Sequence, residues 1–270
     1  MTKVFKLYRW FNVLSFDVVA GAIIGSLFFA RIYSVTPSFI SLVSLGLTVW
    51  VIYTVDRLLD IQDLKGTAAS ERHRFHQRNR KNLIRWLFVV MIIDIGLAVN
   101  MPEVIIIRGS LLSFVVVIYI ILRRRLHVSK ELLVAILYTA GVMLPVWPGS
   151  RMDVVHYLPI LLFFLIALIN LIIFSWFERE NDLRDHQNSV ATLVDEKTIR
   201  KILIGLFIII FAISFYLFLQ PVYHIMSLVF LAMTSTLFLI YFFNDFFSRG
   251  DYYRVVGDAV FLFPFAYILA

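Results

Sequence analysis

Long apolar runs constrain this sequence more than any other feature, because nine of them are long enough, or nearly long enough, to cross a hydrocarbon core about 30 Å thick. Hydrophobic residues make up 61% of the 270 residues, whereas a soluble domain is nearer half apolar. We therefore predict an all-α integral membrane protein, a bundle of nine transmembrane helices that forms one domain over residues 1–270. The runs lie near residues 12–31, 37–57, 83–100, 103–122, 130–148, 157–177, 201–219, 222–243 and 252–269.

Lysine and arginine fall mostly on one side of this predicted bundle. The N-terminus and every second connection carry 22 of the 25, and the opposite side has only Arg31, Arg108 and Arg151. Cationic residues favour the cytoplasmic side, so we expect a multi-pass protein of the cell membrane with a cytoplasmic N-terminus. The net charge of +7 then reflects topology and contact with membrane lipids, and we expect no nucleic-acid partner. The absence of cysteine excludes disulfides and thiolate metal sites.

An acidic stripe follows the second apolar run. Asp56, Asp60 and Asp63 are spaced i, i+4 and i+7. On a helix these offsets lie within roughly 60° of one another, so the three carboxylates share one face. A hard divalent cation such as Mg²⁺ binds carboxylate oxygens. Binding of such a cation would explain why a membrane helix ends in three aspartates on one face.

A second acidic stripe repeats the first at the end of the sixth run. Glu178, Asp182 and Asp185 have the same spacing, and the predicted topology places both stripes on the cytoplasmic side. Two such stripes at the ends of two membrane helices are far more specific than either alone. If they face one another across a cavity mouth, bound magnesium would relieve their mutual repulsion.

Arginines accompany both stripes. Arg57, Arg179 and Arg184 lie within them, and Arg72 and Arg74 follow in the most basic segment of the chain. That segment suits a solvated loop that meets anionic lipid headgroups, or a clamp for phosphate oxygens, since arginine binds these in a bidentate fork. We predict that the five arginines contact a diphosphate.

Three further aspartates lie within apolar runs. Asp17, Asp94 and Asp258 are ionisable groups at membrane depth, where such groups usually face a cavity or a partner. A functional role and a structural hydrogen bond stay open for each of them.

Magnesium prefers one or two protein carboxylates together with substrate phosphates, so a diphosphate is the natural ligand of the facing stripes. A prenyl diphosphate fits the setting, because its head would lie at the interface and its chain in the apolar bundle. Metal ions and arginines would stabilise the charge that builds on the departing diphosphate. An electron-rich acceptor would then attack the allylic cation in a dry cavity.

The two acidic motifs resemble those of the UbiA superfamily of membrane prenyltransferases, and the chain looks like a divergent member of that superfamily. The resemblance covers the whole chain in topology, because that family has nine transmembrane helices with aspartate-rich motifs after the second and sixth. It also includes segment 182–193, which leads from an acidic pair to a threonine and a leucine. Val55 stands where the family's first motif has asparagine, and Glu178 stands where the second commonly has aspartate.

The resemblance implies a magnesium-dependent enzyme, a transferase of alkyl groups other than methyl. It would transfer a prenyl group from a prenyl diphosphate to a lipophilic acceptor, such as an aromatic compound or a quinone or lipid precursor. Catalytic roles are expected for Asp56, Asp60, Asp182 and Asp185, and metal binding for these four with Asp63 and Glu178. Two alternatives remain, a cation-coupled transporter, which also needs membrane carboxylates, and a non-catalytic protein of the same fold.

Overall fold

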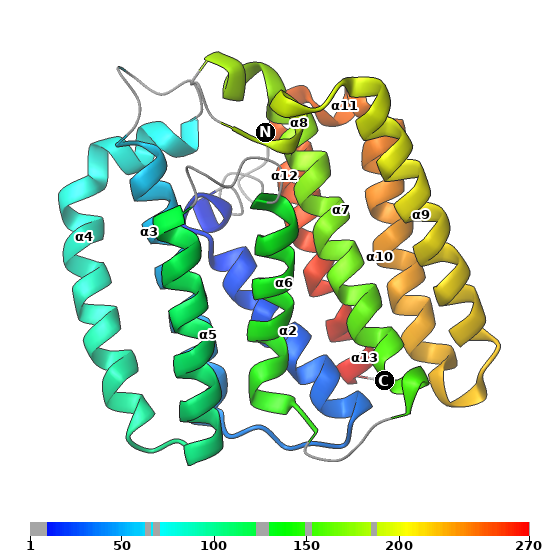
Figure 1. Cartoon of the computed structure of the whole chain (residues 1–270), viewed down its shortest axis with the longest axis horizontal. Coiled ribbons are helices and arrows are strands. Elements are labelled where there is room, and N and C mark those ends of the chain that lie inside the picture. The colour runs from blue at the N-terminus through cyan, green and yellow to red at the C-terminus, as the bar shows by residue number, and fades with distance from the viewer. Residues whose placement is uncertain are drawn as a thin grey trace.

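The computed structural model describes residues 10–62, 66, 71–122, 130–148, 153–184 and 188–269. Within these ranges the chain is helical and has no β-strand, which confirms the all-α prediction, and its long helices lie side by side (Figure 1). The long helices are α2 (Phe16–Ile32), α3 (Phe39–Asp60), α4 (Glu71–Ala98), α5 (Glu103–Leu122), α6 (Lys130–Met143), α7 (Val154–Arg184), α9 (Glu196–Phe218) and α10 (His224–Phe242). The shorter ones are α8 (Val190–Leu193), α11 (Asn244–Phe247), α12 (Tyr252–Ala259) and α13 (Pro264–Leu269).

Each of the nine predicted apolar runs overlaps a helical stretch of the described chain. By length and composition, six helical stretches can cross a membrane, namely Phe39–Asp60, Glu103–Leu122, Val154–Arg184, Glu196–Phe218, Pro221–Phe242 and Arg249–Leu269. The remaining runs fall on α2, on α4, whose first turns are strongly charged, and on α6, which has 14 residues. Nine crossings and a cytoplasmic N-terminus stay predictions.

Side-chain caps fix where two of the long helices begin. The Ser38 hydroxyl accepts a hydrogen bond from the Ser41 amide at 3.1 Å and starts α3. The Asp195 carboxylate accepts one from the Thr198 amide at 2.9 Å and starts α9. Each cap satisfies an amide that has no partner within its own helix.

Helix α7 lies in the middle of the main core. It packs against α6, α9, α10 and α12, and Leu162, Phe163, Ile166 and Ile169 on it are fully buried. Helices α4 and α5 lie on one flank, whereas α9 and α10 lie on the other (Figure 1). Because α7 is central, its last turns are held beside the other helix ends of the bundle.

Gly257 sets the separation of α7 and α12. A Cβ atom at this position would lie 2.6 Å from Asn170 Oδ1 and 2.6 Å from the Phe174 ring, which is closer than such atoms approach one another. A side chain at this position would therefore require Asn170 and Phe174 to move or the two helices to separate. Arg254 and Asp258 lie on α12 close to this contact.

Helices α3 and α4 form a hairpin with a small core of its own. Leu58 and Ile61 pack there against Leu83 and Leu87. The outer faces of α4 and α5 expose large apolar side chains, which suits contact with lipid: Trp86, Phe88, Ile92, Ile107, Leu111 and Ile121.

Candidate diphosphate and metal site

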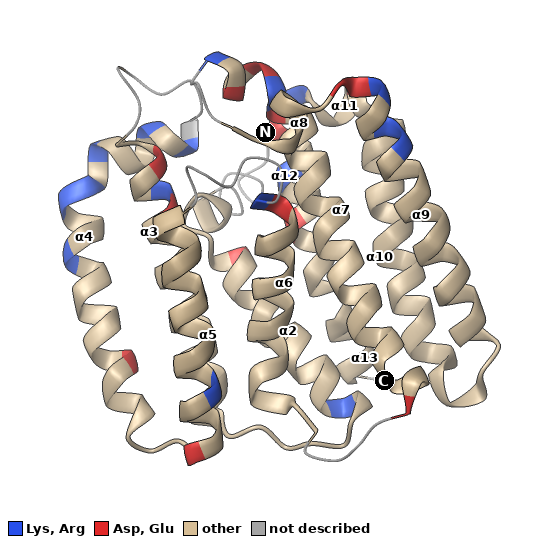
Figure 2. Ribbon diagram, viewed as in Figure 1, with Lys and Arg blue, Asp and Glu red and all other residues tan. Residues whose placement is uncertain are grey.

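Charged residues gather at the end of the bundle where α3 and α7 finish and where α4, α6 and α9 begin (Figure 2). The structure places Asp56 and Asp60 there on α3, and Glu178 and Asp182 on α7. Asp63 and Asp185 lie outside the described residues. Helix α7 continues seven residues beyond the predicted run, which ended at 177, so the second acidic stripe lies on the helix itself.

A cavity of ≈ 60 Å³ with several charged lining residues lies beside the acidic stripes. Helix α3 contributes Tyr53 and Arg57 to it, and α7 contributes Asn170 and Phe174, so the second and sixth predicted runs line the same space. The other lining residues are Val18, Arg72, Val134, Tyr138, Ala167, Leu171, Arg254, Asp258 and Phe261. The four described carboxylates of the stripes are not among them.

Three guanidinium groups, of Arg57, Arg72 and Arg254, line this cavity. Burial and the neighbouring guanidinium groups of Arg57 and Arg254 lower the pKa of Arg72. The Nε atoms of Arg57 and Arg72 are buried and have no hydrogen-bond partner among the described residues. Crowded cations with unused donors are typical of a site that binds an anion.

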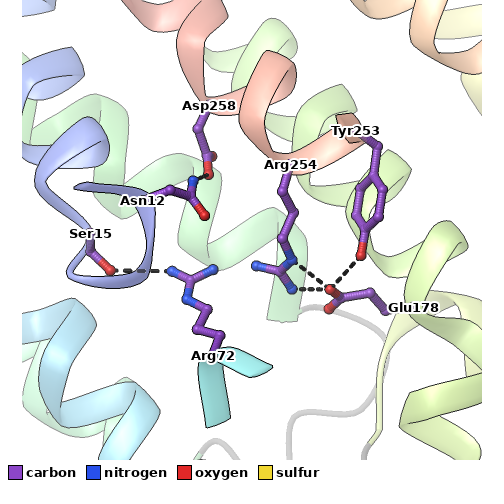
Figure 3. Close-up of polar contacts among 7 residues, drawn as sticks. All are labelled: Asn12, Ser15, Arg72, Glu178, Tyr253, Arg254 and Asp258. Carbon is purple, nitrogen blue, oxygen red and sulfur yellow. Dashed lines mark hydrogen bonds and ion pairs between the residues drawn. The ribbon is translucent and has the colours of Figure 1, made fainter. Parts of the chain in front are cut away.

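Glu178 anchors one of these arginines. Its Oε1 accepts hydrogen bonds from the Arg254 guanidinium, whose Nε lies at 2.6 Å, and from the Tyr253 hydroxyl at 2.8 Å (Figure 3). The two charged side chains are only 13% and 21% exposed. The first carboxylate of the second stripe therefore fixes a cavity arginine from another helix.

Residues just before α2 form hydrogen bonds with Arg72 and with Asp258. Arg72 Nη2 donates to Ser15 Oγ at 3.2 Å, and Asn12 Nδ2 donates to Asp258 Oδ2 at 2.9 Å (Figure 3). Asn12 Nδ2 also donates to Asp17 Oδ2. The membrane-depth aspartates 17 and 258 thus share one asparagine. These hydrogen bonds satisfy the buried carboxyl groups of both aspartates. They support a structural role for Asp17 and Asp258, one of the two interpretations that the sequence left open.

Lys130 links the carboxylates of the first stripe to the rest of the site. The negative charges of Asp56 and Asp60 attract the ammonium group of this lysine. A cation is therefore stabilised where Asp56 and Asp60 lie one turn apart. Hard oxygen donors that already stabilise a cation fit Mg²⁺, which needs only one or two protein carboxylates beside phosphate. In the described part of the chain, no three His, Asp or Glu side chains cluster as a ready-made metal site.

Three predicted arginines do not line the cavity. Arg74 and Arg179 are half-buried outside it, and Arg184 is exposed and lies 3.9 Å from Glu180. The sequence analysis missed Arg254, Asn12 and Lys130. Arg254 had a weak signal, since it lies one turn from the membrane-depth Asp258, but its partner Glu178 is 76 residues away.

Two histidines on the first turns of α4 make the stability of this end of the bundle depend on pH. Burial, followed by the charges of Arg57, Arg254 and Arg72, lowers the pKa of His73 to about 3. Burial also lowers the pKa of His76 to about 4, although its ring Nδ1 lies 2.9 Å from the Arg72 carbonyl oxygen. Both rings are therefore neutral in the folded protein at neutral pH.

The unfolded chain takes up protons on these histidines below pH about 6.5, whereas the folded protein does not. We expect each histidine to lower the free energy of unfolding by about 1.4 kcal/mol for every unit that the pH falls between about 6.5 and its folded pKa. Thermal unfolding at about pH 7.5 and about pH 5 measures this, and His76→Gln should reduce the difference. The exposed His224 is the control, because His224→Gln should leave the difference between the two pH values unchanged. Equal pH dependence in His76→Gln and the unaltered protein would contradict the assignment.

Comparisons with known proteins agree with this architecture. No protein-family model matches the chain, and no curated protein matches it. Two solved structures of a UbiA homolog from Archaeoglobus fulgidus do, one bound to DMAPP and Mg²⁺ and one bound to GPP and Mg²⁺. The first has a TM-score of 0.61 at 13% identity and covers 97% of this chain and 99% of that one. The second has a TM-score of 0.62 at 14% identity and covers 97% and 100%. The resemblance predicted from the two acidic stripes is thereby confirmed for the fold, and the chain has a UbiA-like fold.

Proposed function

We propose that this protein transfers a prenyl group from a prenyl diphosphate to a lipophilic acceptor within the membrane. The observation that carries the proposal is a pair of adjoining cavities. The arginine-lined cavity shares Tyr53, Val134 and Tyr138 with a second cavity of ≈ 590 Å³, whose lining is largely apolar. A cavity lined by arginines that adjoins a larger apolar one suits a ligand with a charged head and a hydrocarbon chain.

Arginines that line the smaller cavity would hold the diphosphate. Arg57 and Arg72 offer buried Nε donors that have no described partner, and Arg254 is fixed by Glu178. When the carbon–oxygen bond breaks, negative charge moves onto the diphosphate. Guanidinium groups that are already in place stabilise that charge without reorganisation.

The acidic stripes would hold Mg²⁺ through Asp56, Asp60 and Asp182, with Asp63 and Asp185 as further ligands. Bound Mg²⁺ would neutralise charge on the diphosphate and so ease its departure. For Glu178 we propose a role in fixing Arg254, because its Oε1 already accepts that guanidinium. The neighbours with a similar fold were solved with Mg²⁺ and with DMAPP or GPP, which supports this choice of ligands.

Aromatic rings lie where the two cavities meet. Tyr53 and Tyr138 line both spaces, and ring faces attract a cation such as the allylic carbon left by the diphosphate. The acceptor would attack this carbon, so that a new bond forms to the prenyl group while diphosphate and one proton are released. Apolar walls exclude the water that would otherwise quench the cation.

Binding of DMAPP and GPP to the protein in nanodiscs, with and without Mg²⁺, tests this function. We expect both to bind only with Mg²⁺, and to release diphosphate when a phenolic or quinone-precursor acceptor is added. Arg72→Gln should weaken binding by about 10- to 100-fold, the effect of one lost charge-assisted hydrogen bond. Arg108→Gln, at the opposite end of the bundle, is the matched control. Absence of Mg²⁺-dependent binding in the unaltered protein, or equal binding by Arg72→Gln, would overturn the proposal.

A further inference from the structure

One carboxylate interrupts the wall of the larger cavity. Of the described side chains that line this space, Asp94 on α4 alone is charged. Its Oδ1 accepts a hydrogen bond from Ser44 Oγ at 2.5 Å, and its Oδ2 accepts one from Thr48 Oγ1 at 2.7 Å. Both hydroxyls come from α3 and also line the cavity, so the three residues form one polar patch on an apolar wall.

This polar patch lies partway along the cavity. Tyr53 marks the end that adjoins the arginines, and Thr48 and Ser44 lie about 7 Å and about 13 Å farther along α3 at 1.5 Å per residue. Past Asp94 the lining continues through Ala98, Met101 and Ile105. A chain that enters beside Tyr53 therefore meets an apolar stretch, then the carboxylate, then apolar space again.

A carboxylate resists being covered by hydrocarbon. The two oxygens of a carboxyl group offer about four hydrogen-bonding positions, and the two hydroxyls occupy only two of them. A hydrocarbon chain lying over the others removes their water and supplies no donor, which is costly. A chain that ends before the patch avoids this cost.

We propose that Asp94, held by Ser44 and Thr48, limits the length of the prenyl chain that this cavity accepts. This rests on the proposed function and adds a specificity-determining residue to it. The apolar stretch between Tyr53 and Thr48–Ser44 suits a short chain such as that of GPP. The longer chain of geranylgeranyl diphosphate would cross the carboxylate to reach Met101.

The test compares dissociation constants for DMAPP, GPP, farnesyl and geranylgeranyl diphosphates in the presence of Mg²⁺. In the unaltered protein we expect GPP to bind more tightly than geranylgeranyl diphosphate. Asp94→Leu removes the charge and should tighten binding of geranylgeranyl diphosphate by about tenfold, with DMAPP unchanged. Asp94→Asn keeps the shape of the side chain and should shift the preference toward long chains by a smaller amount. This variant provides the test if Asp94→Leu does not fold.

A second variant separates ligand selection from helix packing. Ser44→Ala with Thr48→Val also breaks the α3–α4 hydrogen bonds but leaves the carboxylate less satisfied, so it should sharpen the preference for short chains. If Asp94 only joined the two helices, both changes would lower the unfolding temperature and neither would alter the chain preference, which would overturn the inference. If the unaltered protein bound none of the four diphosphates, the proposed function itself would fail.

Discussion

Asp60→Asn is expected to lower the rate of Mg²⁺-dependent diphosphate release by about 10²–10³-fold. Asp60 is 8% exposed, and with Asp56 it stabilises the charge of Lys130, so its carboxylate already acts on a cation. The amide has nearly the same shape but no charge, and it is a poor substitute as a ligand for a hard cation. Single-turnover measurements with GPP over a range of Mg²⁺ concentrations report the change, which should include a weaker apparent affinity for Mg²⁺.

Asp245→Asn is the control for this experiment. Asp245 is exposed on α11 and does not line the cavity, so its replacement should leave both the rate and the Mg²⁺ dependence unchanged. An Asp60→Asn protein that releases diphosphate at the normal rate would show that the first acidic stripe has no part in the reaction.

Glu178→Gln is expected to cost about 3–5 kcal/mol of stability, because it leaves the Arg254 guanidinium buried without its counter-charge. The cost differs from that of an exposed pair such as Arg200–Glu196, which contributes little since water screens it. Thermal or denaturant unfolding in detergent micelles measures the loss.

The double variant Glu178→Gln with Arg254→Gln shows whether the loss comes from the pair. Removing both charges should restore part of the stability, since no unpaired ion then remains in the bundle. If the stability lost in the double variant equalled the sum of the losses in the two single variants, the two side chains would not depend on each other. Glu196→Gln supplies the exposed control and should change the stability by less than about 1 kcal/mol.

Periodicity predicted those parts of the site that lie on a single helix. The i, i+4 spacing of Asp56 and Asp60 placed them on one face, and the structure carries both on α3. Long apolar runs likewise located the helices, since span length follows from bilayer thickness. Such local rules need no knowledge of the packing of distant segments.

Pairs between helices could not be predicted in this way. Arg254 meets Glu178 across 76 positions, and Asn12 meets Asp258 across 246. The first pair depends on how α12 is packed beside α7, and the second depends on where residues 10–15, just before α2, lie against α12. No spacing within the sequence reports these arrangements. The sequence showed that Asp17 and Asp258 needed partners at membrane depth, but it could not name the asparagine that serves both.

The close contact at Gly257 has a consequence for protein engineering. Replacing one of the side chains that line the cavity changes that side chain and its contacts. A methyl group at position 257 would instead press on Asn170 and Phe174 of α7, and any separation of the two helices would carry Arg254 and Asp258 with it. A redesign that enlarges or reshapes this cavity should therefore keep the glycine and make its changes on the α3, α4 and α6 walls.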